Sequence, residues 1–169
     1  MRQGQHLKEW RVATGLIAVD DAVLLVANRR RNEQVEWSPP GGVIDPGEPV
    51  LDALTREVRE ETGLLVETWG ELVYSVEVVA PDHGFHLDVV CHSASGHEGT
   101  ISLDDPDGIV IAAEFVAVHL VADWLDGSPP WVVEPLVEHL AGLRPHGHRF
   151  RYRLTGGPDG ERHVLRLHD

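Results

Sequence analysis

The stretch GVIDPGEPVLDALTREVREETGL, residues 42–64, combines a turn with an amphipathic helical pattern. The cluster DPG at 45–47 is a turn signal, because proline fixes φ and glycine accepts a positive φ. Pro49 suits the first helical position, where its missing N–H would be unsatisfied in any case. Gly63 suits the left-handed position just past a helix end. These signals predict a helix that begins at Pro49 and ends before Gly63.

Apolar residues recur at helical spacing inside this segment and predict one buried stripe. Its members are Val50, Leu51, Leu54 and Val58. At about 100° per residue, Glu57 and Glu61 fall along one edge of the stripe, and Glu60 lies a little further round. The three carboxylates are therefore expected at the rim of the buried face, where they look into a cleft.

Such a group of carboxylates is unfavourable without a counter-charge. Glu57 and Glu61 form a like-charge pair at i,i+4, which costs an isolated helix roughly 0.2–0.5 kcal/mol. Arg56 can offset part of this repulsion by pairing with Glu60. A hard divalent cation reverses the sign of the interaction, because Mg²⁺ binds carboxylate oxygens, water and substrate phosphates. The alternative is a solvated acidic face on an ordinary helix.

The spacing of these residues resembles the Nudix box at every specified position. Gly42 is followed after five residues by Glu48, and after seven more by REVREETGL at 56–64. With average residue usage, a chance match is on the order of 10⁻⁹ or less per starting position. The chain therefore looks like a Nudix hydrolase, and its layout extends the resemblance over residues 12–143.

The resemblance implies an α/β/α sandwich with a mixed sheet between helices, followed by a C-terminal β-hairpin. We expect a single domain over residues 1–169, with an N-terminal arm at 1–10 and the hairpin as an extension at 147–169. The hairpin could extend the sheet or make a homodimer contact.

The implied activity is hydrolysis of a pyrophosphate bond in a nucleoside diphosphate linked to another moiety. A nucleoside triphosphate, ADP-ribose and a nucleotide-sugar all stay open as substrates. The alternative is a Nudix-fold nucleotide-binding or regulatory module without catalysis, against which the intact acidic set argues. A protein whose glutamates only bind Ca²⁺ is a third reading, but the alternating oxygen ligands of an EF-hand loop are missing.

The resemblance also assigns metal ligands. It implies that Glu57, Glu60, Glu61 and the carbonyl of Gly41 hold Mg²⁺, with Mn²⁺ as a substitute. A metal lowers the pKa of its bound water, which then serves as the nucleophile. Either Glu57 or Glu114, an acid directly before an aromatic strand residue, could take the proton.

Four further residues of the box have supporting roles in this reading. Arg56 is expected to orient the glutamates, and Glu48 to anchor the loop against the helix. Gly42 and Gly63 are expected to be structural. Outside the box, Arg29 and Arg30 follow a strand-like run and are candidates for binding the substrate phosphates, with a solvated loop as the alternative.

The remaining chain predicts a mixed or antiparallel sheet and a second helix. The first two strand-like runs, 12–19 and 22–28, are separated by a hairpin signal at Asp20-Asp21. Later strand-like runs are 64–67, 72–79, 85–92, 100–103 and 109–120, followed by a loop at 124–130, an amphipathic helix at 131–143 and a hairpin at 149–167 that turns at 156–160.

The second helix resembles that of the MutT branch, which has a Pro-Pro element before it and Glu-Pro at its start. That branch reads the base with an asparagine directly before the Glu-Pro. Val133 occupies this position here and offers no amide to a purine edge. Pro81 lies where ADP-ribose-type Nudix enzymes tend to carry a proline, which is a weak marker.

Composition limits the partners of the chain. The 169 residues carry a formal net charge of −14, which argues against nucleic acid as the main partner. This charge is also unfavourable for a small nucleotide-type substrate unless metal ions screen the site. A single cysteine, Cys91, and the lack of an apolar signal core or membrane span predict a cytoplasmic protein without a membrane contact. The 11 histidines show no familiar zinc spacing and are expected to be scattered on the surface.

Overall fold

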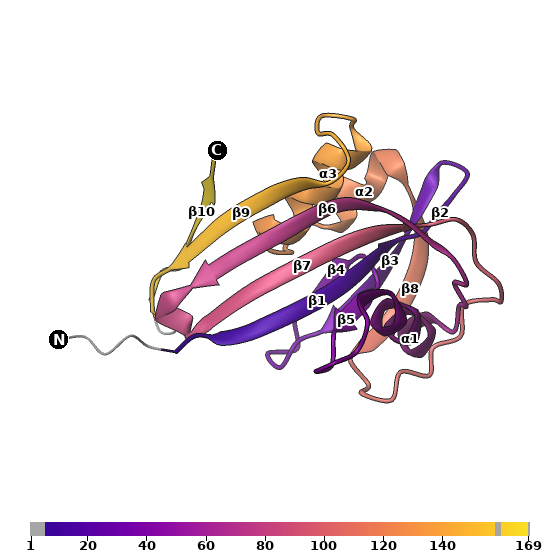
Figure 1. Cartoon of the computed structure of the whole chain (residues 1–169), viewed down its shortest axis with the longest axis horizontal. Helices are drawn as coiled ribbons and strands as arrows, with labels where there is room; N and C mark the ends of the chain where they lie inside the picture. Colours follow the sequence, from indigo (N-terminus) through magenta and orange to yellow (C-terminus); the bar gives the residue numbers. More distant parts are fainter. Residues whose placement is uncertain (1–5, 158–159, 169) are drawn as a thin grey trace.

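The computed structural model describes residues 6–157 and 160–168, and two β-sheets form its centre (Figure 1). The larger sheet has six strands in the order β10-β9-β6-β7-β1-β5 and is mixed, because β1 runs parallel to β7 and β6 runs parallel to β9. Its strands are β1 (Lys8–Leu16), β5 (Gly41–Val43), β6 (Trp69–Ala80), β7 (Phe85–Ala94), β9 (His148–Thr155) and β10 (His163–Leu167).

The smaller sheet is antiparallel and is organised around β3, which pairs with each of the other three strands. It contains β2 (Ala18–Val19), β3 (Ala22–Arg29), β4 (Val35–Ser38) and β8 (Val110–Ala117). The β2–β3 hairpin confirms the predicted turn at Asp20-Asp21. The apolar run 12–19, however, is divided between the two sheets, because the chain crosses from one to the other at the buried Ile17.

Helices cover the large sheet on both faces, which confirms the predicted α/β/α arrangement (Figure 1). The helices are α1 (Val50–Thr62), α2 (Val121–Trp124) and α3 (Pro130–Leu140), with 3₁₀ turns η1 (Pro81–His83) and η2 (Val118–Leu120). On one face, Leu54 and Val58 of α1 pack with Ala13 of β1. On the other, Leu136 of α3 packs with Phe150 of β9. Alternation along the strands therefore gives the molecule two apolar cores.

The predicted ends of the box helix are correct to within one residue. Pro49 has extended φ and ψ angles of −62° and 141° and is the N-cap, so the helix begins at Val50, one residue later than predicted. Gly63 has a φ of 76°, and its N–H donates to the carbonyl of Arg59 over 2.9 Å. Glycine suits this left-handed position because it has no Cβ.

The buried face of α1 is rotated relative to the predicted stripe. Leu51 is 38% exposed, whereas Ala53 is fully buried. Ala53 and Glu57 lie on the side of Leu54 opposite to Leu51, so the buried face is centred closer to the glutamates. Glu61 consequently lies inside the buried face, with 9% of its surface exposed, rather than at its rim.

Several predicted boundaries are wrong. Residues 64–67 and 100–103 form no strand, and the only pairing described there is an isolated bridge between Leu65 and Glu98. The backbone of Ser102 instead closes the end of α1, since its N–H donates to Thr62 over 2.8 Å. The strand predicted at 109–120 stops at Ala117, η2 occupies its last three positions, and α2 ends at Trp124, the first residue of the predicted loop. α3 spans Pro130–Leu140 rather than 131–143.

The predicted C-terminal hairpin is present and extends the large sheet. β9 runs parallel to β6, and β10 pairs antiparallel with β9 at the edge. Part of the predicted turn, residues 158–159, lies outside the described residues, as do residues 1–5 of the expected N-terminal arm. β1 already begins at Lys8 within that arm. Within the described part of the chain, no helix combines the length and apolar character needed to cross a membrane.

Candidate active site

Glu61 is the most enclosed acid of the box. Its Oε2 accepts a hydrogen bond from the backbone N–H of Gly41 over 2.9 Å, and no ion pair to Glu61 occurs among the described residues. Burial, with smaller contributions from the charges of Glu57, Asp105 and Glu60, raises the pKa of its carboxyl to about 8, against the lowering effect of the Gly41 N–H. A carboxylate in this position is stabilised by a cation.

Glu57 lies next to Glu61 in the same cleft and is held against the backbone of β5. Burial raises the pKa of Glu57, although the neighbouring Arg56 lowers it in part. A Cβ built on Gly42 would come within 2.4 Å of the Glu57 carboxyl group. Only glycine leaves room for the carboxylate at this position, so the space around Gly42 agrees with its predicted structural role.

Arg56 is the single arginine within this group of acids. Its Nη1 donates to Glu57 over 2.7 Å and its Nη2 to Glu48 over 2.8 Å, while Nε donates to the other oxygen of Glu48 over 3.1 Å. The predicted i,i+4 contact with Glu60 is present but longer, at 3.5 Å. Arg56 also reaches the carbonyl of Val43 over 3.2 Å, so it ties the loop before α1 to the helix.

The set of donors at this site suits a hard divalent cation. Glu57 and Glu60 both pair with Arg56, and their charges also raise the pKa of Glu61. Among the described residues their oxygens do not all lie within 4.8 Å of one another, so these side chains would have to move closer to hold one ion together. Carboxylate oxygens are the ligands that Mg²⁺ and Mn²⁺ prefer in proteins. Gly41 approaches this cleft through its N–H. The assignment of its carbonyl as a ligand stays a prediction.

Two acids of the loop at 104–107, neither of which was predicted as a site residue, also act on the glutamates of the box. Asp107 raises the pKa of Glu57, and Asp105 raises that of Glu61. The Asp105 carboxylate accepts backbone N–H groups from Ile109 and Val110, both over 2.9 Å, and thereby shapes the loop. Three aspartates within residues 104–107 were the signal in the sequence, but nothing in it indicated which loop faces the box.

Glu114 is exposed on β8, opposite Leu25 of β3. The loop acids, and not Glu114, contribute to the raised pKa values of Glu57 and Glu61. The role of Glu114 as general base stays a prediction from the resemblance alone. Asp107 is near enough for its charge to raise the pKa of Glu57, and it takes part in no ion pair within the described ranges, so it is a third candidate.

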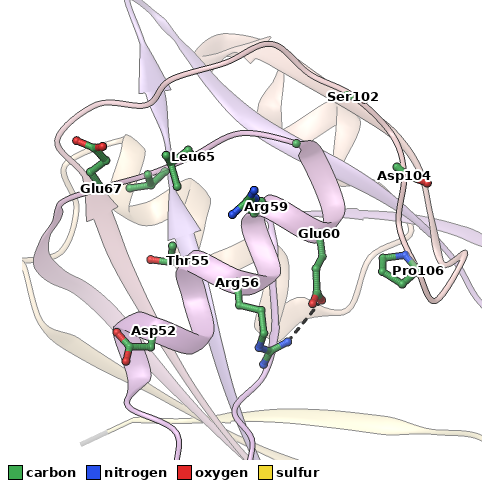
Figure 2. Close-up of a pocket in the computed structure, with 12 residues that line it drawn as sticks. Asp52, Thr55, Arg56, Arg59, Glu60, Leu65, Glu67, Ser102, Asp104 and Pro106 are labelled. Atoms are coloured by element: carbon green, nitrogen blue, oxygen red, sulfur yellow. Dashed lines mark hydrogen bonds and ion pairs between the residues drawn. The ribbon is translucent and has the colours of Figure 1, made fainter.

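An open groove of about 1140 Å³ runs along the outer face of α1, between the helix and the loop that carries Asp104 and Pro106 (Figure 2). Glu60 and Arg56 form one side of the groove, and Figure 2 shows their ion pair as a dashed line. Arg59, one turn along, also lines it. The groove is therefore continuous with the outer carboxylate of the box.

A second hollow of about 300 Å³ lies on the other face of the large sheet and reaches Gly41. Its apolar lining includes Tyr74, Leu87, Val89, Trp131 and Val132, and its polar lining is Thr14, Asn28, Arg30 and Ser38. The Asn28 amide donates to the Ser38 hydroxyl over 2.9 Å. An aromatic pocket with a few convergent polar groups is typical of a small-molecule site.

The two predicted phosphate-binding arginines separate in the structure. Arg30 lines the second hollow, and its Nε donates to Glu36 over 2.7 Å. Arg29 lies at the end of β3 and approaches Glu33 at 3.9 Å on the surface. Val133 packs against the apolar core, and its neighbour Val132 lines the hollow instead.

A different group of acids surrounds His86 on the large sheet. Its Nδ1 lies 2.6 Å from Glu9, and its Nε2 lies 3.2 Å from Glu77 and 3.7 Å from Asp88. Arg149 pairs with both Glu77 and Asp88. Because cations already balance these carboxylates, the group is a surface ion-pair network. It includes none of the box residues.

Comparison with known proteins agrees with this geometry. The model of the NUDIX domain matches residues 9–137. Human 8-oxo-dGDP phosphatase NUDT18 is 40% identical over 65 residues, which are 38% of this chain and 20% of that protein. The ADP-ribose pyrophosphatase of Methanocaldococcus jannaschii is 37% identical over 51 residues, 30% of each chain. The match thus spans only a fifth to a third of these relatives.

Solved structures share the whole fold. The MutT NUDIX hydrolase from Burkholderia pseudomallei has a TM-score of 0.65 at 26% identity, over 78% of this chain and 98% of that one. The E. coli ORF135 protein has a TM-score of 0.67 at 25% identity, over 82% and 92% of the two chains. Because the domain match covers most of its length, the chain belongs to the Nudix family.

Proposed function

We propose that the chain is a Mg²⁺-dependent hydrolase that cuts a pyrophosphate bond in a nucleoside diphosphate linked to another moiety. The observation that carries this proposal is Glu61, a buried carboxylate whose one described partner is the Gly41 N–H and whose pKa is raised to about 8. Without a cation, burial of this charge only destabilises the fold. The site is thus built for a cation, and a bound cation attracts phosphates.

The residues of the box and its neighbouring loop have different roles in this proposal. Glu57, Glu60 and Glu61 would hold the metal, which supplies charge stabilisation at the phosphates and an activated water when it is bound. Arg56 fixes Glu57 and Glu48 through separate N–H groups, so the carboxylates are oriented before the substrate arrives. Asp107 belongs to a loop whose charge acts on Glu57, and it is a further candidate for the general base.

The hollow beside Gly41 supports a nucleoside as one part of the substrate. Trp131 and Tyr74 provide aromatic surface, and Asn28 and Ser38 provide polar groups at the hollow. Arg30 also lines the hollow and can approach a phosphate. Related proteins named for 8-oxo-dGDP and for ADP-ribose make both substrate groups reasonable here. Val133 removes the amide that the MutT branch uses to read the base.

A catalytically inert Nudix module that only binds nucleotides is the competing function. The complete set of box carboxylates favours the enzyme, and it is supported by the pairing of Glu57 and Glu60 with Arg56 and by the contact of Glu61 with Gly41.

A hydrolysis screen tests the proposal. Purified chain with Mg²⁺ is incubated with nucleoside triphosphates, 8-oxo-dGDP, ADP-ribose and nucleotide-sugars, and product masses identify the bond that is cut. We expect turnover of at least one substrate that stops when EDTA is added. Binding of a nucleotide without product formation under Mg²⁺ and Mn²⁺ would instead identify the inert module.

A further inference from the structure

Positive charge is concentrated near the C-terminus of this acidic chain. Residues 144–169 contain six of the 14 Lys and Arg residues, but only three of the 28 Asp and Glu residues. The last part of the chain is therefore net positive, although the protein as a whole carries −14. A basic region that is retained within an acidic surface indicates attraction to an anion.

Three of these six arginines and two histidines line one hollow of about 210 Å³, which we name the hairpin hollow. Its lining consists of Arg144, His148, Arg149, Phe150, Arg166, Leu167 and His168. Among the described residues, no acidic side chain belongs to the lining. None of these residues lines the groove along α1 or the hollow beside Gly41, so the hairpin hollow is separate from the candidate active site.

Two glutamates of α3 hold Arg166 of the hairpin hollow in place. Arg166 donates to Glu138 of α3 through both terminal nitrogens and approaches Glu134 at 3.3 Å. Its guanidinium also lies 5.0 Å from the centre of the Phe150 ring. Because these contacts fix Arg166 before any ligand arrives, little side-chain entropy is lost on binding.

Arg144 adds donors that the protein does not use. Its Nε donates to Glu138 over 2.8 Å, while its two terminal nitrogens make no hydrogen bond to any described residue. The Glu138 carboxylate thus accepts hydrogen bonds from two guanidiniums, and these hydrogen bonds lower its pKa to about 2. The rings of His148 and His168 likewise line the hollow without a described hydrogen bond. Several N–H groups therefore remain available to a ligand.

We propose that the hairpin hollow binds a phosphate group, with Arg144 as its principal ligand and Arg166 and the two histidines as further donors. A phosphate offers several strong acceptor oxygens, and the planar guanidinium fits them with two parallel hydrogen bonds. The hollow is wider than a single water requires but small for a whole nucleotide. The ligand is inorganic phosphate or the phosphate end of a monoester.

Binding is measured on the full chain in EDTA, because metal-free carboxylates of the box repel anions. Inorganic phosphate and glycerol phosphate are titrated by calorimetry, with NaCl at equal ionic strength as the blank. We expect saturable binding of at least one probe. Arg144→Ala should weaken it by about tenfold, since a charge-assisted hydrogen bond is lost. Arg153→Ala is the matched control and should bind normally, because Arg153 is an exposed arginine of β9 that does not line the hollow.

A second variant, Glu138→Gln, is expected to strengthen phosphate binding. Glu138→Gln removes the carboxylate that Arg144 and Arg166 share, so phosphate should bind about threefold more tightly or better, provided circular dichroism shows a folded chain. The proposal is overturned if neither probe binds more than the NaCl blank. It is also overturned if Arg144→Ala and Arg153→Ala weaken binding equally.

Discussion

The Nudix box and the hairpin hollow have opposite charge arrangements. In the box, Glu57 and Glu60 pair with Arg56, whereas the neighbouring Glu61 has no ion pair among the described residues. In the hairpin hollow, two guanidiniums share Glu138. The pKa of Glu61 is raised to about 8 by burial, whereas arginine hydrogen bonds lower the pKa of Glu138 to about 2.

The difference shows that the neighbours, and not the residue type, decide what each glutamate does. Glu61 has a backbone N–H as its partner and lies inside a core face, so its negative charge remains available to a cation. Glu138 is already neutralised, so the excess charge at its site is positive. Each region is thus complementary to a ligand of the opposite sign.

The largest expected effect comes from removing a charge from the box. Glu61→Gln should lower turnover by at least about a hundredfold while the chain still folds, because it removes a metal ligand and leaves the side-chain volume unchanged. Initial rates at saturating Mg²⁺ measure this. Glu67→Gln, an acid that lines the groove beyond the helix, should keep the normal rate. A Glu61→Gln rate close to that of the wild type would remove this residue from the metal site.

Replacement of the shared arginine should have the next largest effect. Arg56→Lys keeps the charge but cannot reach Glu48 and Glu57 with separate N–H groups, so we expect a loss of about 1 kcal/mol in the free energy of unfolding. Urea unfolding measures it. Arg59→Lys, on the exposed side of the same helix, is the control and should be neutral. An equal loss in the free energy of unfolding in both variants would show that the separate N–H groups of the Arg56 guanidinium have no special role.

Metal and pH should act together on the box. The folded chain holds the Glu61 proton more tightly than the unfolded chain does, because folding raises the pKa of this carboxyl. The free energy of unfolding of the metal-free chain therefore falls as pH rises from about 4.5 to about 8. Mg²⁺ should therefore raise Tm more at about pH 8 than at about pH 5, by a few degrees. Thermal melts with EDTA or Mg²⁺ test this. An equal Mg²⁺ effect at both pH values would contradict it.

The smallest expected effect concerns Glu138 beside the hairpin hollow, whose contribution to stability should depend on pH in the opposite direction. Because the folded pKa of Glu138 is lowered, its stabilising contribution is complete above the unfolded pKa of about 4.5 and disappears as pH falls toward 2. The Tm difference between the wild type and Glu138→Gln should shrink as the pH is lowered from about 5 to about 3. A difference that stays constant over this range would mean that the arginines do not perturb Glu138.

The box could be predicted from sequence because its parts are neighbours in the chain. Pro49 and Gly63 mark the ends of α1, and the glutamates follow helical spacing. The burial of Glu61 was missed because the position of β5 decides which face of the helix is covered. Asp105 and Asp107 were missed because their approach to the box depends on a loop more than 40 residues away in sequence.

The rest of the site depends on long-range pairing. The hollow beside Gly41 combines residues from Val12 to Val132, and no local pattern brings these positions together. The division of the run 12–19 between two sheets likewise follows from the parallel pairing of β1 with β7. Contacts of Glu138 with Arg166, 28 residues apart, arise only once the hairpin has joined the sheet.

The parallel pairing of β9 with β6 also affects the time course of folding during synthesis. Phe150 and Tyr152 belong to the same apolar core as Val76 and Val78, which are made more than 70 residues earlier. While the ribosome adds those residues, at about 5–20 per second, one edge of β6 lacks its neighbour and its apolar face is incompletely covered. The nascent chain thus passes several seconds in a state that exposes an unpaired strand, and holding chaperones would protect it until β9 emerges.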